Sequence, residues 1–189
     1  MKNLFIPIKM FLLMTVITGL IYPLMITAYA QLMHPYKSNG SMISFNNKII
    51  GSELIGQQFI KPEYFWGRPS SIGNNPMPSG GSNLNPLGST FKEYFSTRVD
   101  TIRKYHGNIE LSSIPRDLLF SSGSGVDPHI SLEAAYFQIE RISKYRHLSE
   151  LQIKKLKEIV QSSIESPDLL IFGEYRINVL KLNLQLNSI

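Results

Sequence analysis

The sequence has no cysteine and few charged residues. The absence of Cys among 189 residues excludes disulfides, thiolate metal sites and thiol nucleophiles together. Charged side chains make up 17% of the chain and the net charge is +5, without a long basic run, so a nucleic-acid partner is not expected. The G-x-x-x-x-G-K-[ST] signature is also missing, which excludes a phosphate-binding loop of the P-loop kind.

One long apolar run, Met10–Ala30, lies near the N-terminus. It holds no charged residue and as a helix would be about 31 Å long, which matches a hydrocarbon core of about 30 Å. We predict a membrane-spanning helix at residues 10–32. A cleaved signal peptide is the alternative, because residues 28–30 (Ala-Tyr-Ala) resemble a cleavage site, but the apolar run is longer than is usual for such peptides.

The basic residues around this run predict its orientation. Lys2, Lys9 and the amino terminus precede the span, whereas only Lys37 follows it closely. Basic residues are enriched on the cytoplasmic side of membrane helices. We therefore expect residues 1–9 to be cytoplasmic and the remainder of the chain to lie outside, with a single pass through the cytoplasmic (inner) membrane.

Small residues recur every four positions within the span. They are Thr15, Gly19, Pro23 and Thr27. Such a stripe allows a second membrane helix to approach closely, which predicts a helix–helix interface, and Pro23 is expected to add a kink. The alternative is that these residue types are simply common in membrane helices.

The rest of the chain is predicted to be a linker at 33–40 followed by one α+β domain at 41–189. Strands at Met42–Phe45 and Ile49–Phe59 form a hairpin around a turn at 46–48, with a bulge at Gly51 or Gly56. The aromatic run in KPEYFWGRPS (61–70), beside Arg68, is typical of a core edge with a surface ion pair, and a recognition patch is the alternative.

Helices follow a long irregular loop at residues 71–90, which is rich in Gly, Pro, Asn and Ser. Apolar spacing predicts a helix at Phe91–Tyr105. A second helix starts at a Ser131 cap and ends near Arg146, and a third follows a capping box at Ser149, forming a hairpin with the second. In the third helix, one apolar face is predicted: Leu151, Leu156, Ile159, Val160 and Ile164. Alternating apolar residues from Ile177 to Leu186 predict a final strand with a bulge at 179–180.

The run SSGSGVDPHIS (121–131) resembles an active site, but each catalytic template fails on spacing. Pro128 occupies the place of the third glycine of a dinucleotide fingerprint, and Ser124 lies outside a G-x-S-x-G motif. Asp127 and His129 supply only two of the three or four ligands that a metal needs. A structural explanation accounts for more: Gly123 and Gly125 permit a turn that leads into the helix cap, in a loop that also suits contact with a partner.

Seven segments, in order, carry a resemblance to a known family. They are TGLIYPL (18–24), GSELIGQQF (51–59), YFWGRPS (64–70), SGGSNL (79–84), IPRDL (114–118), SGSGVDPHIS (122–131) and FGEYRINVLKLNLQLN (172–187). Together they resemble the C subunit of the Kdp-type potassium-transporting P-type ATPase. The sequence departs from the family pattern at Asn85–Ser89, at Tyr175, and at Leu119-Phe120.

This resemblance implies a small accessory subunit of a pump and no catalysis of its own. A channel-like subunit would carry potassium, a P-type subunit would hydrolyse ATP, and a further small single-span subunit would complete the complex in the lipid bilayer. The C subunit assists assembly and has a chaperone-like effect on nucleotide affinity. ATP and K⁺ would be handled by the partners, and no cofactor or metal is expected on this chain, which lacks the Asp-Lys-Thr-Gly phosphorylation motif.

The motif loops of the exterior domain are expected to contact partner subunits at the side from which potassium enters. The expected contact residues are Arg68, Pro69, Ser70, Gly80, Gly81, Ser82, Asn83, Gly123, Ser124, Gly125, Asp127, Pro128 and His129. Two alternatives stay open. One is a membrane-anchored serine hydrolase using Ser89 with Lys92 (an S-x-x-K match) or Ser124, and the other is a stand-alone binding protein.

Overall fold

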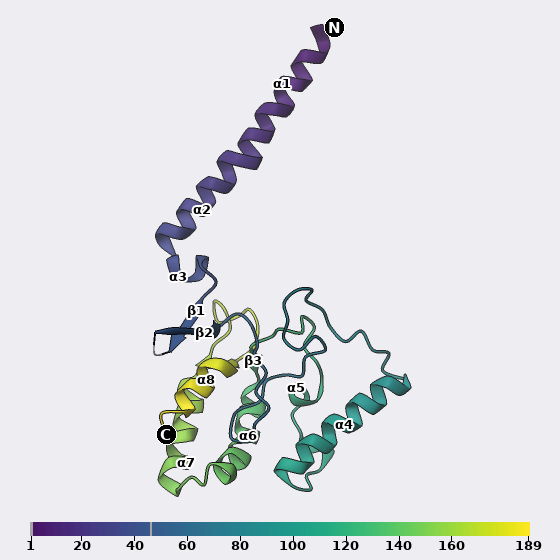
Figure 1. The fold of residues 1–189 in the computed structure, drawn as a ribbon, viewed down its shortest axis with the longest axis vertical. Coiled ribbons are helices and arrows are strands. Elements are labelled where there is room, and N and C mark those ends of the chain that lie inside the picture. Colours follow the sequence, from purple (N-terminus) through teal and green to yellow (C-terminus); the bar gives the residue numbers. More distant parts are fainter. Residues whose placement is uncertain (1, 46) are drawn as a thin grey trace. The chain divides into compact units, whose positions relative to one another are not determined.

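The structure, a computed structural model, describes residues 2–45 and 47–189. It divides into two compact units, of which the first ends at Ser52 and the second begins at Glu53. An N-terminal apolar helix precedes a domain of mixed helix and sheet (Figure 1). The predicted fold class, α+β with one N-terminal membrane-type helix, is confirmed.

The first unit is dominated by one long helix. It comprises α1 (Lys2–Val16), the π-helical turn η1 (Ile17–Ile21) and α2 (Tyr22–Met33). Residues Leu4–Met33 are long and apolar enough to cross a membrane. The π-turn directly precedes Tyr22-Pro23, where proline lacks the N–H that an α-helical hydrogen bond would need. A short helix, α3 (Pro35–Ser38), lies within the predicted linker.

The predicted hairpin forms, but its second strand is shorter than expected. Strand β1 (Met42–Phe45) pairs with β2 (Lys48–Ser52). Ile43 pairs with Gly51 and Ser44 with Ile49, so Ile50 is an extra residue in β2 and the register shifts there. This irregularity lies beside Gly51, one of the two positions where a bulge was predicted. Of the predicted turn, Asn46 lies outside the described residues. The prediction that the strand continues to Phe59 is wrong, because the following backbone bonds elsewhere: the Gly56 N–H donates to the Val126 carbonyl at 2.7 Å.

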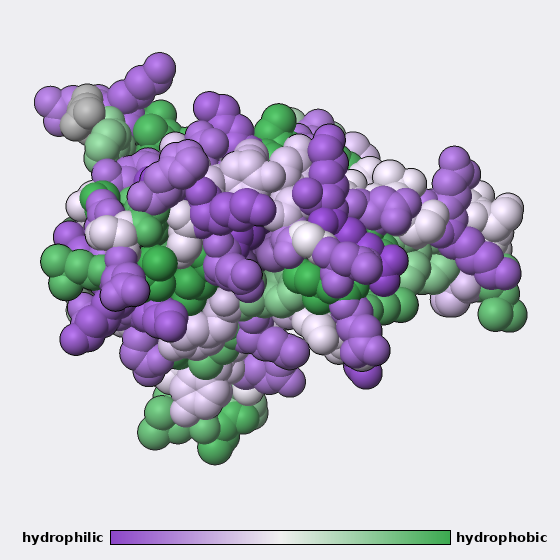
Figure 2. All heavy atoms as spheres, turned by 90° about the horizontal axis from the view of Figure 1, so that it is seen from below, coloured by the Kyte–Doolittle hydropathy of each residue, from purple (hydrophilic) through white to green (hydrophobic). Residues whose placement is uncertain are grey.

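The second unit packs its helices around α6 and a small sheet. Its elements are α4 (Ser89–His106), η2 (Leu111–Ser113), α5 (Arg116–Leu119), β3 (His129–Ile130), α6 (Leu132–Tyr145), α7 (Glu150–Ser162), β4 (Ile164–Glu165), β5 (Arg176–Asn178) and α8 (Val179–Leu186). The sheet is antiparallel in the order β3-β5-β4. Hydrophilic side chains cover most of the face shown in Figure 2, and hydrophobic groups gather in separate clusters.

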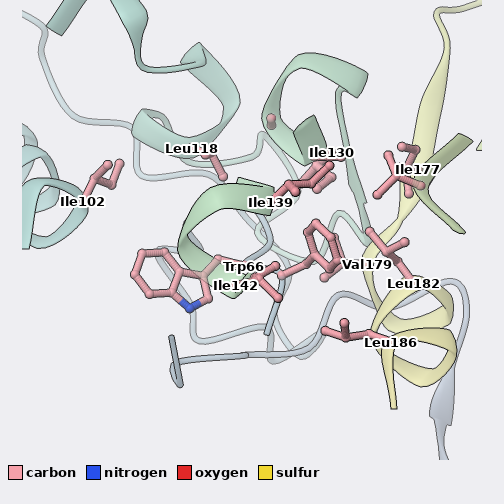
Figure 3. Packing of buried hydrophobic residues seen from close by; sticks show 14 of the residues in the cluster. Trp66, Ile102, Leu118, Ile130, Ile139, Ile142, Ile177, Val179, Leu182 and Leu186 are labelled. Carbon is pink, nitrogen blue, oxygen red and sulfur yellow. The ribbon is translucent and has the colours of Figure 1, made fainter. Parts of the chain in front are cut away.

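The core lies where α4, α5, α6 and α8 converge. Figure 3 shows Ile102, Leu118, Ile142 and Leu182 pointing inward from these helices, with Trp66 beside them. All four aliphatic side chains are fully buried. The aromatic run therefore forms part of the core, as predicted.

Helix ends follow the predicted caps. The Ser131 hydroxyl accepts the Ala134 N–H at the start of α6, and Ser149 forms a capping box with Gln152 at the start of α7. Helices α6 and α7 pack against each other, as expected for a helical hairpin. The prediction for Leu151 is wrong, because its side chain is 78% exposed and the buried face of α7 is formed by Leu156 and Val160.

The predicted C-terminal strand is wrong beyond Asn178. Only Arg176–Asn178 is a strand, and α8 begins at Val179 because the Asn178 side chain accepts the Lys181 N–H as an N-cap. Val179, Leu182 and Leu186 are buried at helical spacing, although the leucines at alternate positions suggested a strand. The register change predicted at 179–180 marks the boundary between strand and helix.

Candidate functional site

Loops from three sequence motifs meet in one place, which we call the motif junction (residues 68–70, 80–81 and 122–129). The Ser122 N–H donates to the Pro69 carbonyl at 3.1 Å, and the Ser70 hydroxyl donates to the Gly125 carbonyl at 2.5 Å. The Gly80 N–H donates to the Ser124 carbonyl at 2.9 Å. Loops that are far apart in sequence are thus joined through their backbones, which fixes their relative positions.

Glycine allows this close approach. Gly125 has φ +71°, and a Cβ there would lie 2.6 Å from the Gly80 carbonyl oxygen. A Cβ on Gly81 would lie 3.1 Å from the Gly123 carbonyl oxygen. Side chains at these positions would push the loops apart, so the glycines serve the junction's backbone contacts rather than a bound phosphate.

Arg68, Asp127 and His129 form the charged part of the junction. Arg68 Nη1 lies 3.1 Å from Asp127 Oδ2, while Asp127 Oδ1 accepts the backbone N–H of His129. Burial would raise the pKa of Asp127, but hydrogen bonds from the side chain and backbone of His129 and the charge of Arg68 hold it below its usual value. Asp127 therefore stays ionised as a structural partner.

Further polar contacts extend from His129 to α8. His129 Nε2 lies 3.6 Å from Glu165, which also accepts from Lys181 at 3.4 Å. Lys181 Nζ lies 2.7 Å from Glu53. Burial would lower the pKa of Lys181, but its hydrogen bond to Glu53 and the charge of Glu165 raise it. The junction is thereby connected to β4 and to the first turn of α8.

The catalytic alternatives find no support in this geometry. The Ser124 hydroxyl accepts the Val126 N–H, and Ser89 opens α4 without a hydrogen bond to Lys92 within the part of the chain described. Over residues 2–45 and 47–189, no group of three His, Asp or Glu side chains could hold a metal ion. Within the junction, Asp127 accepts hydrogen bonds from Arg68 and from the backbone N–H of His129.

Two expected contact residues lie apart from this cluster. Ser82 and Asn83 make no hydrogen bond to the junction among the described residues, and Asn83 is exposed with φ +49°. Pro128 belongs to the junction through its backbone, since its carbonyl accepts the Val179 N–H at 2.9 Å. The structure therefore assembles most of the predicted loop residues in one place, and their contact with a partner stays a prediction.

The small residues of the long helix are exposed along its length. Thr15 and Thr27 donate their hydroxyls to the carbonyls of Phe11 and Pro23, four residues earlier. A Cβ on Gly19 would meet no atom within 4 Å. In a regular α-helix, residues four positions apart differ by about 40° around the helix axis, so a stripe at this spacing winds slowly around the helix. The π-helical turn has more residues per turn and therefore rotates less per residue, which brings the four small residues closer to one line along the helix.

A buried polar frame supports the aromatic run and was not predicted from the sequence. The Asn183 side chain accepts the Phe65 N–H at 2.8 Å and donates to the Phe65 carbonyl at 2.9 Å. The Gln138 side chain likewise accepts the Trp66 N–H at 2.7 Å and donates to the Trp66 carbonyl at 3.2 Å. Arg141 donates to the carbonyls of Pro62 and Tyr64. The signal in the sequence was a polar residue on an apolar helix face, at Gln138 and Arg141.

Comparison with known proteins decides which family these motifs belong to. A family model described as KdpC, the c chain of the K⁺-transporting ATPase, matches residues 4–188. The chain belongs to the KdpC family.

KdpC relatives from different bacteria align over nearly their whole length. A potassium-transporting ATPase KdpC subunit from Leptospira interrogans is 45% identical over 183 residues, covering 97% of this chain and 92% of the relative. Those of Caldanaerobacter subterraneus and Polaromonas naphthalenivorans are 44% and 42% identical, covering 95% and 100% of this chain and 91% and 96% of the relatives. The family resemblance that the seven motifs indicated is confirmed. The role of an accessory pump subunit is consistent with this family. The hydrolase alternative is not favoured.

Proposed function

We propose that this chain is the non-catalytic accessory subunit of an ATP-driven potassium uptake pump. It crosses the inner membrane once at residues 10–32, with residues 1–9 in the cytoplasm, and the α+β domain stabilises the complex on the side from which potassium enters. The observation that carries the proposal is the KdpC family match over residues 4–188. The hydrogen-bonded motif junction supports it, because those loops form a rigid surface rather than a reactive site.

An exposed apolar loop offers a contact surface for a partner subunit. Leu169, Leu170, Ile171 and Phe172 are 83, 79, 75 and 61% exposed, although they are consecutive and apolar. Soluble surfaces rarely display such runs unless they bind another surface. We infer that this loop, with Tyr175, packs against the channel-like potassium-binding subunit.

The long helix supplies the second contact. Its stripe of Thr15, Gly19, Pro23 and Thr27 has no bulky side chain, so a neighbouring membrane helix can approach the backbone closely. The threonine hydroxyls donate within the helix, which leaves the stripe without unpaired donors in lipid. This helix would join the membrane part of the complex, and the domain would join the exterior part.

An effect on ATP use has to be indirect in this arrangement. ATP is held on the cytoplasmic side, whereas the charge bias at Lys2 and Lys9 places the domain outside. Any chaperone-like effect on the nucleotide affinity of the P-type subunit would therefore pass through the membrane subunits. Neither ATP nor K⁺ needs to bind this chain.

Thiol labelling tests the orientation, because the natural chain has no cysteine. Ser79→Cys places a single thiol on an exposed loop of the domain. A membrane-impermeant maleimide should label it in intact spheroplasts, whereas Asn3→Cys, the control on the cytoplasmic side, should react only after lysis. Labelling of Ser79→Cys only after lysis would overturn the proposed orientation, and purification of tagged chain without either large subunit would overturn the assembly role.

A further inference from the structure

A cavity of about 310 Å³ lies between the segment 57–60, the segment 66–70 and helix α4. Two arginines, Arg68 and Arg98, line it, and its walls contain no Asp or Glu. The remaining lining residues are neutral, and they include Gln58, Phe59, Ile60, Trp66, Asn74 and Thr101. The cavity therefore has two positively charged side chains on its walls, of which Arg68 pairs with Asp127 outside the lining and Arg98 has no carboxylate partner among the described residues.

Arg98 is partly buried and has no carboxylate partner among the described residues. Its Nε donates to the Leu118 carbonyl at 2.7 Å, and its guanidinium carbon lies 5.8 Å from the centre of the Trp66 ring. Among the described residues it forms no ion pair, and its terminal N–H groups have no hydrogen-bond acceptor. Desolvation lowers the pKa of Arg98, because a partly buried guanidinium loses contact with water.

Arg68 has only part of its hydrogen-bonding capacity satisfied. Its Nη1 pairs with Asp127, but its Nε is buried and has no partner in the part of the chain described. A buried donor without an acceptor destabilises the fold unless a water or a ligand supplies one. The unpaired donors of Arg68 and Arg98 belong to side chains that line the same cavity.

A third guanidinium increases the positive potential. Arg141 lies 3.8 Å from the centre of the Trp66 ring and bonds to neutral acceptors, the carbonyls of Pro62 and Tyr64. Burial and the charge of Arg98 lower the pKa of Arg141 to about 9. Of these three arginines, only Arg68 has a carboxylate partner among the described residues.

We propose that this cavity binds an oxyanion, a carboxylate or phosphate group, that accepts hydrogen bonds from Arg98 and Arg68. Guanidinium groups bind such anions with two parallel hydrogen bonds, and the bond is strong where water is excluded. Asn74 and Gln58 add neutral amides, and Phe59 with Ile60 gives an apolar wall for the rest of the ligand. The oxyanion comes either from solution or from an acidic side chain of a partner subunit, and the second source rests on the proposed function.

Trp66 provides the measurement, because it is the only tryptophan and lines the cavity. Inorganic phosphate titrated into the purified full chain in detergent, at constant ionic strength maintained with chloride, should change the Trp66 emission in a saturable way. Arg98→Gln should weaken the apparent affinity at least tenfold. Arg116→Gln removes the same charge from an exposed site outside the cavity and should leave the titration unchanged.

A second variant keeps the test independent of any folding defect in Arg98→Gln. Thr101→Glu places a carboxylate on the cavity wall while both arginines remain, so it should abolish the response to phosphate. An absent or non-saturable response in the natural chain, or an equal response in Arg98→Gln or Thr101→Glu, overturns the proposal.

Calorimetry on the assembled complex distinguishes the two sources. The difference in phosphate binding heat between the natural complex and the Arg98→Gln complex isolates this cavity, since phosphate sites on other subunits contribute equally to both. A difference that persists in the complex assigns a solution anion. A difference seen in the isolated chain and lost in the complex assigns a partner carboxylate. Failure of the chain to assemble overturns the proposed function but leaves the titration of the isolated chain interpretable.

Discussion

At the residue scale, His106 illustrates how charge is distributed around the core. Its Nδ1–H donates to the Ile102 carbonyl at 3.1 Å, and its Nε2 accepts from Arg141 Nε at 3.3 Å. Burial, and then the positive charge of Arg141, lower the pKa of His106 to about 4, although the bond to Ile102 opposes this. The folded protein therefore holds this imidazole neutral.

The neutral His106 predicts a loss of stability in mild acid. Between an unfolded pKa of about 6.5 and a folded pKa of about 4, the unfolded chain binds a proton that the folded chain does not, so the free energy of unfolding falls as pH falls. Because the ring is partly exposed, we expect the loss to be about 1 to 2 kcal/mol. Urea unfolding followed by Trp66 emission at pH 7 and pH 4.5 measures it.

His106→Gln provides the comparison, because glutamine does not titrate. Its free energy of unfolding should fall less than that of the natural chain between the two pH values, while the carboxylates contribute equally to both. Equal losses would show that His106 does not cause the acid sensitivity.

At the scale of elements, the motif junction depends on loops rather than on helices or strands. Two backbone–backbone hydrogen bonds and one from the Ser70 hydroxyl join the segments 68–70, 80–81 and 122–129. Such contacts require that no side chain intervene, and Gly125 meets that requirement with φ +71°. A single methyl group added at Gly125 should therefore disturb the packing of these loops.

Gly125→Ala should destabilise the domain by about 2 kcal/mol, because the methyl would strain a positive φ and clash with the Gly80 carbonyl. Thermal unfolding of the full chain measures the change. Gly123→Ala is the matched control, since a Cβ there meets no atom within 4 Å and its φ is not positive. If the two variants unfold at the same temperature, the close approach of the loops does not contribute to stability.

The sequence alone predicted those elements whose structure depends on neighbouring residues, such as helix caps and apolar runs. Caps at Ser131 and Ser149 predicted two helices, and the apolar run predicted the long helix. Helix α8 was missed because leucines at alternate positions fit a strand until tertiary packing selects the helical face. The contacts that Glu165 makes with His129 and Lys181 were also missed, because only the folded chain brings these segments together.

At the scale of the whole molecule, the apolar surfaces lie on both units. The long helix exposes its apolar side chains, and the second unit exposes Leu169–Phe172. Other exposed apolar side chains of the domain, such as Leu87 and Leu151, are not part of a consecutive run. Figure 2 shows hydrophilic side chains between the hydrophobic clusters of one face. Within a pump, these two surfaces would anchor the chain independently, one in the membrane and one on the exterior.

The double substitution Leu170→Ser and Ile171→Ser should weaken attachment to the large subunits. If both side chains are buried at an interface, the apparent affinity should fall about tenfold or more. Detergent co-purification with the tagged chain measures the loss. Leu87→Ser, at another side chain that is 84% exposed, is the control and should retain its partners. Equal recovery from both variants would show that the loop makes no essential contact.

The buried polar frame has a consequence for the order in which the domain folds. The segment from Pro62 to Trp66 satisfies its backbone groups with Gln138, Arg141 and Asn183, and the bond between Phe65 and Asn183 spans 118 positions of the chain. That segment cannot reach its native conformation until Asn183 has been synthesised. During synthesis, the segment around Phe65 must therefore remain without these partners until Asn183 has left the ribosome.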